Sequence, residues 1–197
     1  MKKLDISTVD LVGCLPPEHC APGVAATEFD PGDFILVEGK SLVSRLINFG
    51  QKLRIHGADR QYVNWTHAAL IVDRDGTLIE AVGKGVTKSS LDNYTGSHYK
   101  IFRIKASDED RRQVVDFAGW VEEHHGKYGR LTFVSIALTL LTGSKLAFFI
   151  DGQFVCSGLV ATALERTGCI FNRSAAHIGP ADLAKYFDPA QPHHQAA

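Results

Sequence analysis

The sequence predicts an α+β fold in which helices pack on a mainly antiparallel sheet. Short apolar runs typical of strands cluster in the middle of the chain, between residues 33 and 106, whereas helix-period patterns dominate its second half. Two of these runs flank Asp75-Gly76, a dipeptide that favours a tight hairpin between antiparallel strands. The 197 residues suffice for one domain with a sizeable core. We expect an irregular segment over 1–28, a folded domain over 29–188 and a frayed tail over 189–197.

The elements of the first half follow from local signals. The run 33–39 follows Pro31-Gly32 and is short and apolar, which predicts a strand. Residues 41–54 predict a helix with Ser41 as its N-cap. This helix carries four large apolar residues on one face, as an amphipathic helix does: Leu42, Leu46, Phe49 and Leu53.

The remaining elements are predicted in the same way. The hairpin around Asp75-Gly76 is followed by a strand over 98–106 and by a helix over 107–126 that Ser107 would cap and Gly126 would end. Further helices are expected near 131–142, directly after Cys156, and from Pro180 to the end of "PADLAKYF". Gly168 stands where the cysteine helix would have its C-cap.

Composition limits the classes of partner. The chain is 45% hydrophobic and 22% charged with a formal net charge of −1, so there is no overall attraction to nucleic acid or to anionic membranes. Asp5 and Asp10 interrupt the apolar region that a signal peptide needs. The apolar run 133–141 is too short to span a bilayer. We expect a cytoplasmic protein with no nucleic-acid partner and no stable membrane insertion, and the oligomeric state stays open.

The cysteine pattern argues against a disulfide framework and against a metal site. Four cysteines in a chain of this length are too few for a disulfide-stapled scaffold. Cys14, His19 and Cys20 do not match the ligand spacing of a zinc site. We therefore expect neither a metal nor an organic cofactor.

Cys156 stands at the start of an amphipathic helical run, where it is either a buried packing residue or a nucleophile. A helix N-terminus favours a thiolate through the helix dipole and free N–H groups, and a nearby imidazolium lowers the thiol pKa further. The same N–H groups can stabilise an oxyanion. The chemical role of Cys156 therefore depends on whether a base lies opposite it.

His67 and Glu80 are the candidate base and its partner. His67 lies inside the strand "WTHAALIVD", where it is either a satisfied core histidine or a general base held rigidly by the sheet. Glu80 lies among apolar residues of the next strand, and its carboxylate is costly to bury unless paired, for instance with the Nδ1–H of His67. With Asp75-Gly76 as a two-residue turn, however, Glu80 stands opposite Ile71, too far from His67 for a direct bond. A longer loop or a bulge would be needed.

Three blocks of the sequence together resemble the circularly permuted branch of the NlpC/P60 superfamily of papain-like enzymes, the YiiX/YebB-like group. They are "PGDFILVEGKSLVSRLI", "THAALIVDRDGTLIEAVGKGV" and "FVCSGLVATAL", and with the ending "GPADLAKYF" they span about residues 30–187. The resemblance implies a permuted papain-like fold with Cys156 as nucleophile, His67 as base and Glu80 as the residue that orients it. It implies no metal or cofactor, and it implies a hairpin register that brings Glu80 to His67. Candidates for an oxyanion-hole side chain are Tyr128, Gln153 and Tyr186.

The expected function is a cysteine-dependent hydrolase, an amidase or peptidase that cleaves a small or cell-wall-derived peptide through a thioester. One alternative is lipid acyl chemistry of the lecithin:retinol acyltransferase-like type, with the runs 133–141 and 146–150 lining an acyl groove. No basic amphipathic membrane-binding helix is apparent in the sequence, which argues against this alternative. The other alternative is a non-catalytic ligand-binding module that keeps the cleft.

Overall fold

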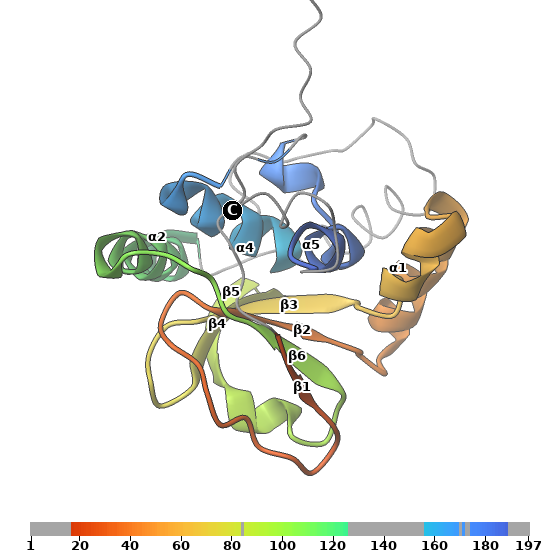
Figure 1. Cartoon of the computed structure of the whole chain (residues 1–197), viewed down its shortest axis with the longest axis horizontal. Coiled ribbons are helices and arrows are strands. Elements are labelled where there is room, and N and C mark those ends of the chain that lie inside the picture. Colours follow the sequence, from red (N-terminus) through yellow and green to blue (C-terminus); the bar gives the residue numbers. More distant parts are fainter. Residues whose placement is uncertain (1–16, 84, 126–155, 170, 172–173, 189–197) are drawn as a thin grey trace, which may run out of the picture.

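The predicted α+β class is confirmed by a computed structural model, which describes residues 17–83, 85–125, 156–169, 171 and 174–188. Its centre is an open six-stranded antiparallel sheet with the strand order β1-β6-β2-β3-β4-β5 (Figure 1). The strands are β1 (Glu18–Cys20), β2 (Phe34–Val37), β3 (His67–Ile71), β4 (Thr77–Val82), β5 (Gly85–Ser90) and β6 (Tyr99–Phe102).

The helices form a layer on one face of this sheet. α2, α4 and α5 lie over that face, and α1 stands beside the sheet near the start of β3 (Figure 1). The α-helices are α1 (Leu42–Arg54), α2 (Asp108–His125), α4 (Cys156–Leu164) and α5 (Pro180–Tyr186). Short 3-10 helices are η1 (Gly57–Tyr62), η2 (Leu91–Tyr94), η3 (Glu165–Thr167) and η4 (Ala175–His177).

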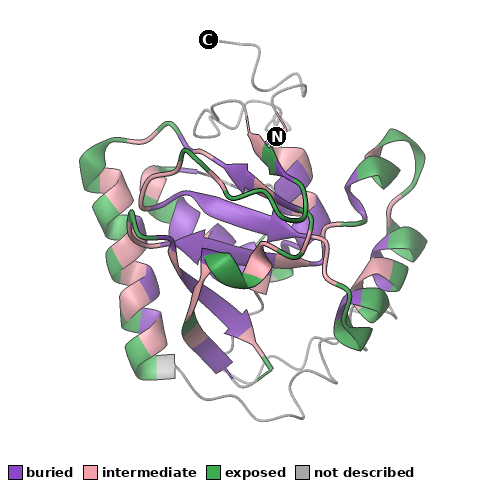
Figure 2. Cartoon of the chain, turned by 90° about the horizontal axis from the view of Figure 1, so that it is seen from below, coloured by how far each residue is buried: buried purple, intermediate pink, exposed green. Residues whose placement is uncertain are grey.

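Both faces of the central strands are buried, which explains why they read as unbroken apolar runs. In β2, Phe34 and Leu36 join the core beneath the helices, whereas Ile35 and Val37 join a second cluster on the opposite face. Figure 2 accordingly shows buried residues concentrated on the strands of the sheet. Two separate cores therefore hold the sheet rigidly between them.

The predicted helix ends agree with the structure. The Ser41 hydroxyl accepts a hydrogen bond from the Ser44 backbone N–H at 3.0 Å, and the Ser107 hydroxyl accepts one from the Asp110 N–H at 3.1 Å. Gly168 has a φ of 75° at the end of η3, a left-handed conformation that favours glycine. Pro180 is the first residue of α5, as expected for a residue that lacks an N–H.

The hairpin between β3 and β4 differs from the prediction in its loop. Leu70 pairs with Ile79, and the Val72 N–H donates to the Thr77 carbonyl at 2.9 Å, so four residues rather than two form the loop. The Asp73 carboxylate organises it by accepting the backbone N–H groups of Asp75 and Thr77 at 3.0 and 2.8 Å. The expected two-residue turn at Asp75-Gly76 is therefore wrong.

Two edge strands were not expected. Residues 18–20 form β1 against β6, inside the segment 1–28 that the sequence predicts to be mostly irregular. β5 pairs with β4 along its whole length and had no apolar run to mark it. The expected helix near 131–142, the apolar runs 133–141 and 146–150 and the tail 189–197 lie outside the described residues. Within the described part of the chain, no helix has the length and apolar character needed to cross a membrane.

Candidate active site

His67 is the first residue of β3, the strand next to the centre of the sheet. Its backbone pairs with Val37 of β2, and the following residue, Ala68, faces the helix layer. The small Ala68 side chain leaves room for the N-terminus of α4 to approach the strand. The helix that approaches His67 in this way begins with Cys156.

Glu80 meets His67 directly. The imidazole Nε2 lies 2.5 Å from the Glu80 Oε2, and the Glu80 side chain is only 6% exposed. The four-residue loop makes this contact possible, because continuing the observed register places Glu80 opposite Ala69 instead of Ile71. The expected hydrogen bond from the His67 Nδ1–H to Glu80 is wrong in one detail, because the Nε2 atom of His67 makes this bond. The Nδ1 atom is therefore the ring nitrogen left for the Cys156 sulfur.

Tyr94 is a further member of the site that the sequence did not reveal. It ends η2, its hydroxyl donates to the same Glu80 oxygen, and its ring stacks beside the His67 ring with centroids 6.0 Å apart. Burial and the neighbouring Glu80 carboxylate both raise the pKa of Tyr94, so its hydroxyl keeps the proton that it donates. No local sequence signal marks Tyr94, because its contact with Glu80 depends on β5, an edge strand without an apolar run.

Cys156 is the first residue of α4 and is partly buried. Its sulfur is hydrogen-bonded to the His67 imidazole and to the backbone N–H groups of Ala68 and Ser157. The Ser157 hydroxyl donates to the Ile178 carbonyl at 2.7 Å, which fixes the first turn of α4 against the segment that leads into α5. The structure therefore brings Cys156, His67 and Glu80 into one hydrogen-bonded chain.

The electrostatics of this chain favour charge separation. Burial alone would raise the pKa of the Cys156 thiol, but the His67 charge and the hydrogen bonds to sulfur outweigh it and lower that pKa. Burial would lower the pKa of His67, but Cys156 and Glu80 outweigh it and raise that pKa. Glu80 stays ionised, because its bonds to His67 and Tyr94 lower its pKa against the effect of burial. These shifts all favour the charged forms: the thiolate of Cys156, the imidazolium of His67 and the carboxylate of Glu80.

Such an arrangement has the parts needed for nucleophilic acyl transfer. The thiolate is the reactive form of cysteine, and the imidazolium beside it can protonate a leaving group. The backbone N–H groups of Ser157 in α4 and Ala68 in β3 already stabilise negative charge on the sulfur, and groups of this kind can stabilise an oxyanion. Of the predicted oxyanion-hole candidates, Tyr128 and Gln153 lie outside the described residues, and Tyr186 packs edge-on against the Phe171 ring.

The other cysteines and the candidate metal ligands lie elsewhere. Cys20 and Cys169 are buried in the two different cores, and Cys14 lies outside the described residues. Among the residues with described positions, no three His, Cys, Asp or Glu side chains are grouped so that they could hold a metal ion.

Neither a scan against models of known protein families nor a search of curated proteins found a match to this chain. The chemistry of the site is therefore inferred from its own residues.

Proposed function

We propose that the protein is a cysteine-dependent hydrolase that cleaves amide bonds through a thioester, with Cys156 as nucleophile. The observation that carries the proposal is the continuous contact from the Cys156 sulfur through His67 to Glu80, because it supplies a nucleophile, an acid–base group and an orienting carboxylate in one line. Cys156 itself is only partly buried.

Each residue has a defined step in the proposed reaction. The Cys156 thiolate attacks the carbonyl carbon, and the His67 imidazolium gives its proton to the leaving amine as the C–N bond breaks. The neutral imidazole then takes a proton from water, whose oxygen attacks the thioester and releases the acid and the thiolate. Glu80 accepts the Nε2–H throughout, which keeps the other ring nitrogen directed at the sulfur.

The fold proposed for this site is the permuted papain-like fold. A cysteine at the start of a helix that packs on a sheet strand bearing the histidine is the arrangement that such a fold requires, and here the histidine and carboxylate precede the cysteine in the chain. The substrate class proposed with it, a small or cell-wall-derived peptide, rests on the resemblance of the three sequence blocks.

The test is turnover of a panel of small peptide amides, cell-wall-derived peptides and acyl esters by wild type, Cys156→Ala and Cys156→Ser. We expect both variants to fold and to lose turnover, while Cys20→Ala, which removes a buried thiol from the opposite core, keeps it. Full activity in Cys156→Ala would remove the thiol mechanism. Preference for acyl esters over amides would point to lipid acyl chemistry instead of peptide cleavage.

A binding module would behave differently. If the cleft only binds a ligand, no member of the panel is turned over and Cys156 reacts with iodoacetamide as an ordinary thiol does, with an apparent pKa of about 8.5. The proposed hydrolase instead requires alkylation of Cys156 well below that pH, because His67 lowers the thiol pKa.

A further inference from the structure

α1 packs on the protein with its polar side and turns its apolar side outward. The side facing the body carries Ser44, Asn48 and Gln51, which recur at helical spacing. Gln51 is buried and bonds to the carbonyls of Val63 and Trp65 and to the Ala181 N–H, with distances of 2.9, 2.9 and 3.1 Å. This reverses the usual arrangement, in which the apolar face of a helix covers the core.

The outward side is a continuous apolar stripe. Leu42, Leu46, Phe49 and Leu53 fall within a narrow arc of the helix, and their exposed fractions are 77%, 43%, 53% and 54%. Val43 on the flank is 41% exposed, so α1 carries five of the seven large hydrophobic residues that are exposed in the described part of the chain. An apolar patch concentrated on one helix marks an interaction surface, whereas scattered residues would not.

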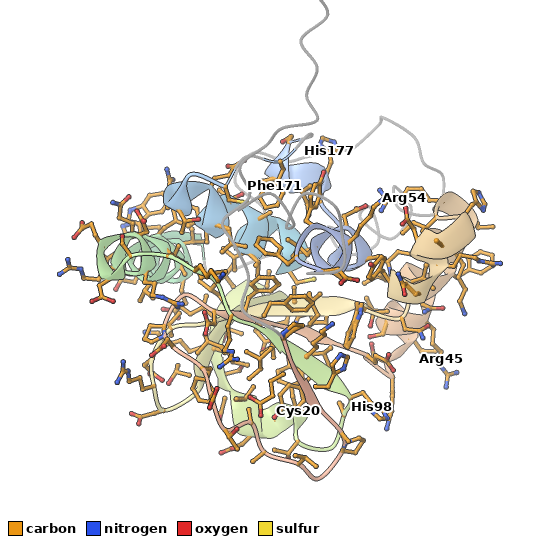
Figure 3. All side chains as sticks on the ribbon, viewed as in Figure 1. Cys20, Arg45, Arg54, His98, Phe171 and His177 are labelled. Atoms are coloured by element: carbon orange, nitrogen blue, oxygen red, sulfur yellow. The ribbon has the colours of Figure 1, made fainter. Side chains whose placement is uncertain are left out.

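Positive charge borders this stripe. Residues 39–58 contain four basic residues and no acidic one, in a chain whose net charge is −1. Arg54 pairs with Asp182 at 2.7 Å. Lys40, Arg45 and Lys52 are exposed and have no carboxylate partner among the described residues. Figure 3 shows Arg45 directed away from the body of the protein.

From these observations we propose that α1 docks the protein on an anionic lipid surface. Leucine and phenylalanine side chains on one arc would enter the boundary between headgroups and acyl chains, while Arg45 and Lys52 on its shoulder reach the headgroup phosphates. The polar side of the helix stays bonded to the protein, so docking needs no unfolding of α1.

A lipid surface fits this helix better than a second copy of the chain. At roughly 100 Å² of exposed area apiece, five side chains fall short of the about 800 Å² per partner that a stable protein interface buries. Two copies of α1 would also bring Arg45 and Lys52 toward their own equivalents, which is unfavourable. Anionic lipid headgroups supply the opposite charge.

The segment that leads into α1 is bonded to the residue that precedes β3. The Gly39 N–H, just before α1, donates to the Thr66 hydroxyl at 2.9 Å, and Thr66 directly precedes His67. The proposal itself does not depend on catalysis, and Cys156→Ala should bind vesicles as wild type does.

The test is co-sedimentation of the full chain with vesicles of phosphatidylcholine mixed with phosphatidylglycerol, and with vesicles of phosphatidylcholine alone. We expect binding to the anionic vesicles that weakens with added salt. Leu46→Gln/Phe49→Gln should lower the partition coefficient about tenfold or more, since it removes the apolar contact. The matched control Val24→Gln, which alters a residue 50% exposed elsewhere, should leave it unchanged.

Charge is tested separately. Arg45→Glu/Lys52→Glu should lower anionic-vesicle binding about tenfold or more, whereas Lys105→Glu, an exposed lysine outside α1, should have little effect. No vesicle binding, or equal binding to neutral and anionic vesicles, would overturn the proposal. Two further results would overturn it: a dimer, seen by sedimentation, that Leu46→Gln/Phe49→Gln abolishes, or a loss of thermal stability in that variant. Each result would show that protein, and not lipid, covers the apolar stripe.

Discussion

The imidazole of His67 contributes more to the candidate site than the carboxylate beside it, because it touches the sulfur while Glu80 acts through the ring. We expect His67→Ala to lower turnover by about 10²–10⁴-fold, the usual worth of a general acid or base. In the His67→Ala variant, the pKa of Cys156 should rise toward about 8.5, the value of a free thiol. Glu80→Gln keeps a hydrogen-bond acceptor but loses the charge, so both effects should be smaller.

The measurement is the pH profile of Cys156 alkylation by iodoacetamide in wild type, His67→Ala and Glu80→Gln, alongside turnover. Circular dichroism of each variant checks that the fold is kept. If Glu80→Gln leaves both the rate and the thiol pKa at wild-type values, Glu80 does not position His67.

Tyr94 should act as a positioning residue behind Glu80. Tyr94→Phe keeps the ring beside His67 and removes the hydroxyl that bonds to Glu80, so the pKa of Glu80 should rise. We expect turnover to fall by less than in Glu80→Gln, with KM unchanged and the low-pH limb of the activity profile shifted upward. A structural role alone would lower thermal stability without moving that limb.

Activity and alkylation should differ in their pH dependence. Both should fall as the pH decreases and Cys156 gains a proton, at a pH below the usual thiol pKa. The pKa of His67 is raised to about 10, and above it the imidazole loses the proton that the leaving group needs. Turnover should therefore be bell-shaped, while alkylation should rise with pH and stay high. Alkylation that falls again near pH 10 would contradict this assignment of the two groups.

At the scale of single elements, Gly39 sets how closely α1 approaches β3. A Cβ there would overlap the Ser44 hydroxyl and lie 2.9 and 3.0 Å from the Ser44 Cβ and the Thr66 Oγ1. Gly39→Ala should lower the free energy of unfolding by about 1–3 kcal/mol, the usual cost of overpacking. Gly119, in the middle of α2, has nothing within 4 Å of such a Cβ, so Gly119→Ala should raise the free energy of unfolding by about 0.5–1 kcal/mol. Urea unfolding of both variants measures the difference, and equal effects would contradict it.

The elements that sequence reasoning found are those with their own local signals. Ser41, Ser107 and Pro180 mark helix starts through bonds or backbone angles within a few residues, and all three agree with the structure. β1 and β5 are edge strands with polar residues, so their pairing partners rather than their own patterns define them. The hairpin loop was misjudged because the Asp73 side chain competes with the turn that Asp75-Gly76 favours.

The same limit applies to the candidate site. Cys156, His67 and Glu80 were found because each had a signal of its own: a helix start, a strand histidine and a buried acid. The contact between them could not be derived from the sequence, because it depends on a shift of two residues in the pairing of β3 with β4. The contact of Tyr94 with Glu80 and the outward apolar face of α1 both depend on which surfaces meet in three dimensions. The periodicity of a helix shows that its two faces differ in polarity, but it does not show which face packs on the protein.

At the scale of the whole molecule, the ion pair between Asp33 and Arg111 joins the helix layer to the sheet. The Asp33 carboxylate is 1% exposed and accepts hydrogen bonds from Arg111 at 2.8 Å and from the Ile104 N–H at 3.0 Å. Arg111→Ala leaves this carboxylate buried without its counter-charge and should lower the free energy of unfolding by about 3–5 kcal/mol.

The control for this prediction is the next residue along α2. Arg112 is 70% exposed and pairs with Glu109 on the surface, so Arg112→Ala should change stability by no more than about 0.5 kcal/mol. Urea unfolding of the two variants should separate them clearly. Similar values for both would mean that the buried pair does not hold α2 to the sheet.

The order of the site residues along the chain has a consequence for biosynthesis. All six strands of the described sheet, with His67 and Glu80, precede Cys156, so a chain made from its amino end can form this sheet before the proposed nucleophile leaves the ribosome. Until α4 docks, the Cys156 thiol lacks its imidazole and keeps ordinary, weak reactivity. Under the proposed mechanism the activated thiol would therefore arise only when α4 docks on the sheet, and nascent chains would carry no activated thiol to be oxidised or to attack their neighbours.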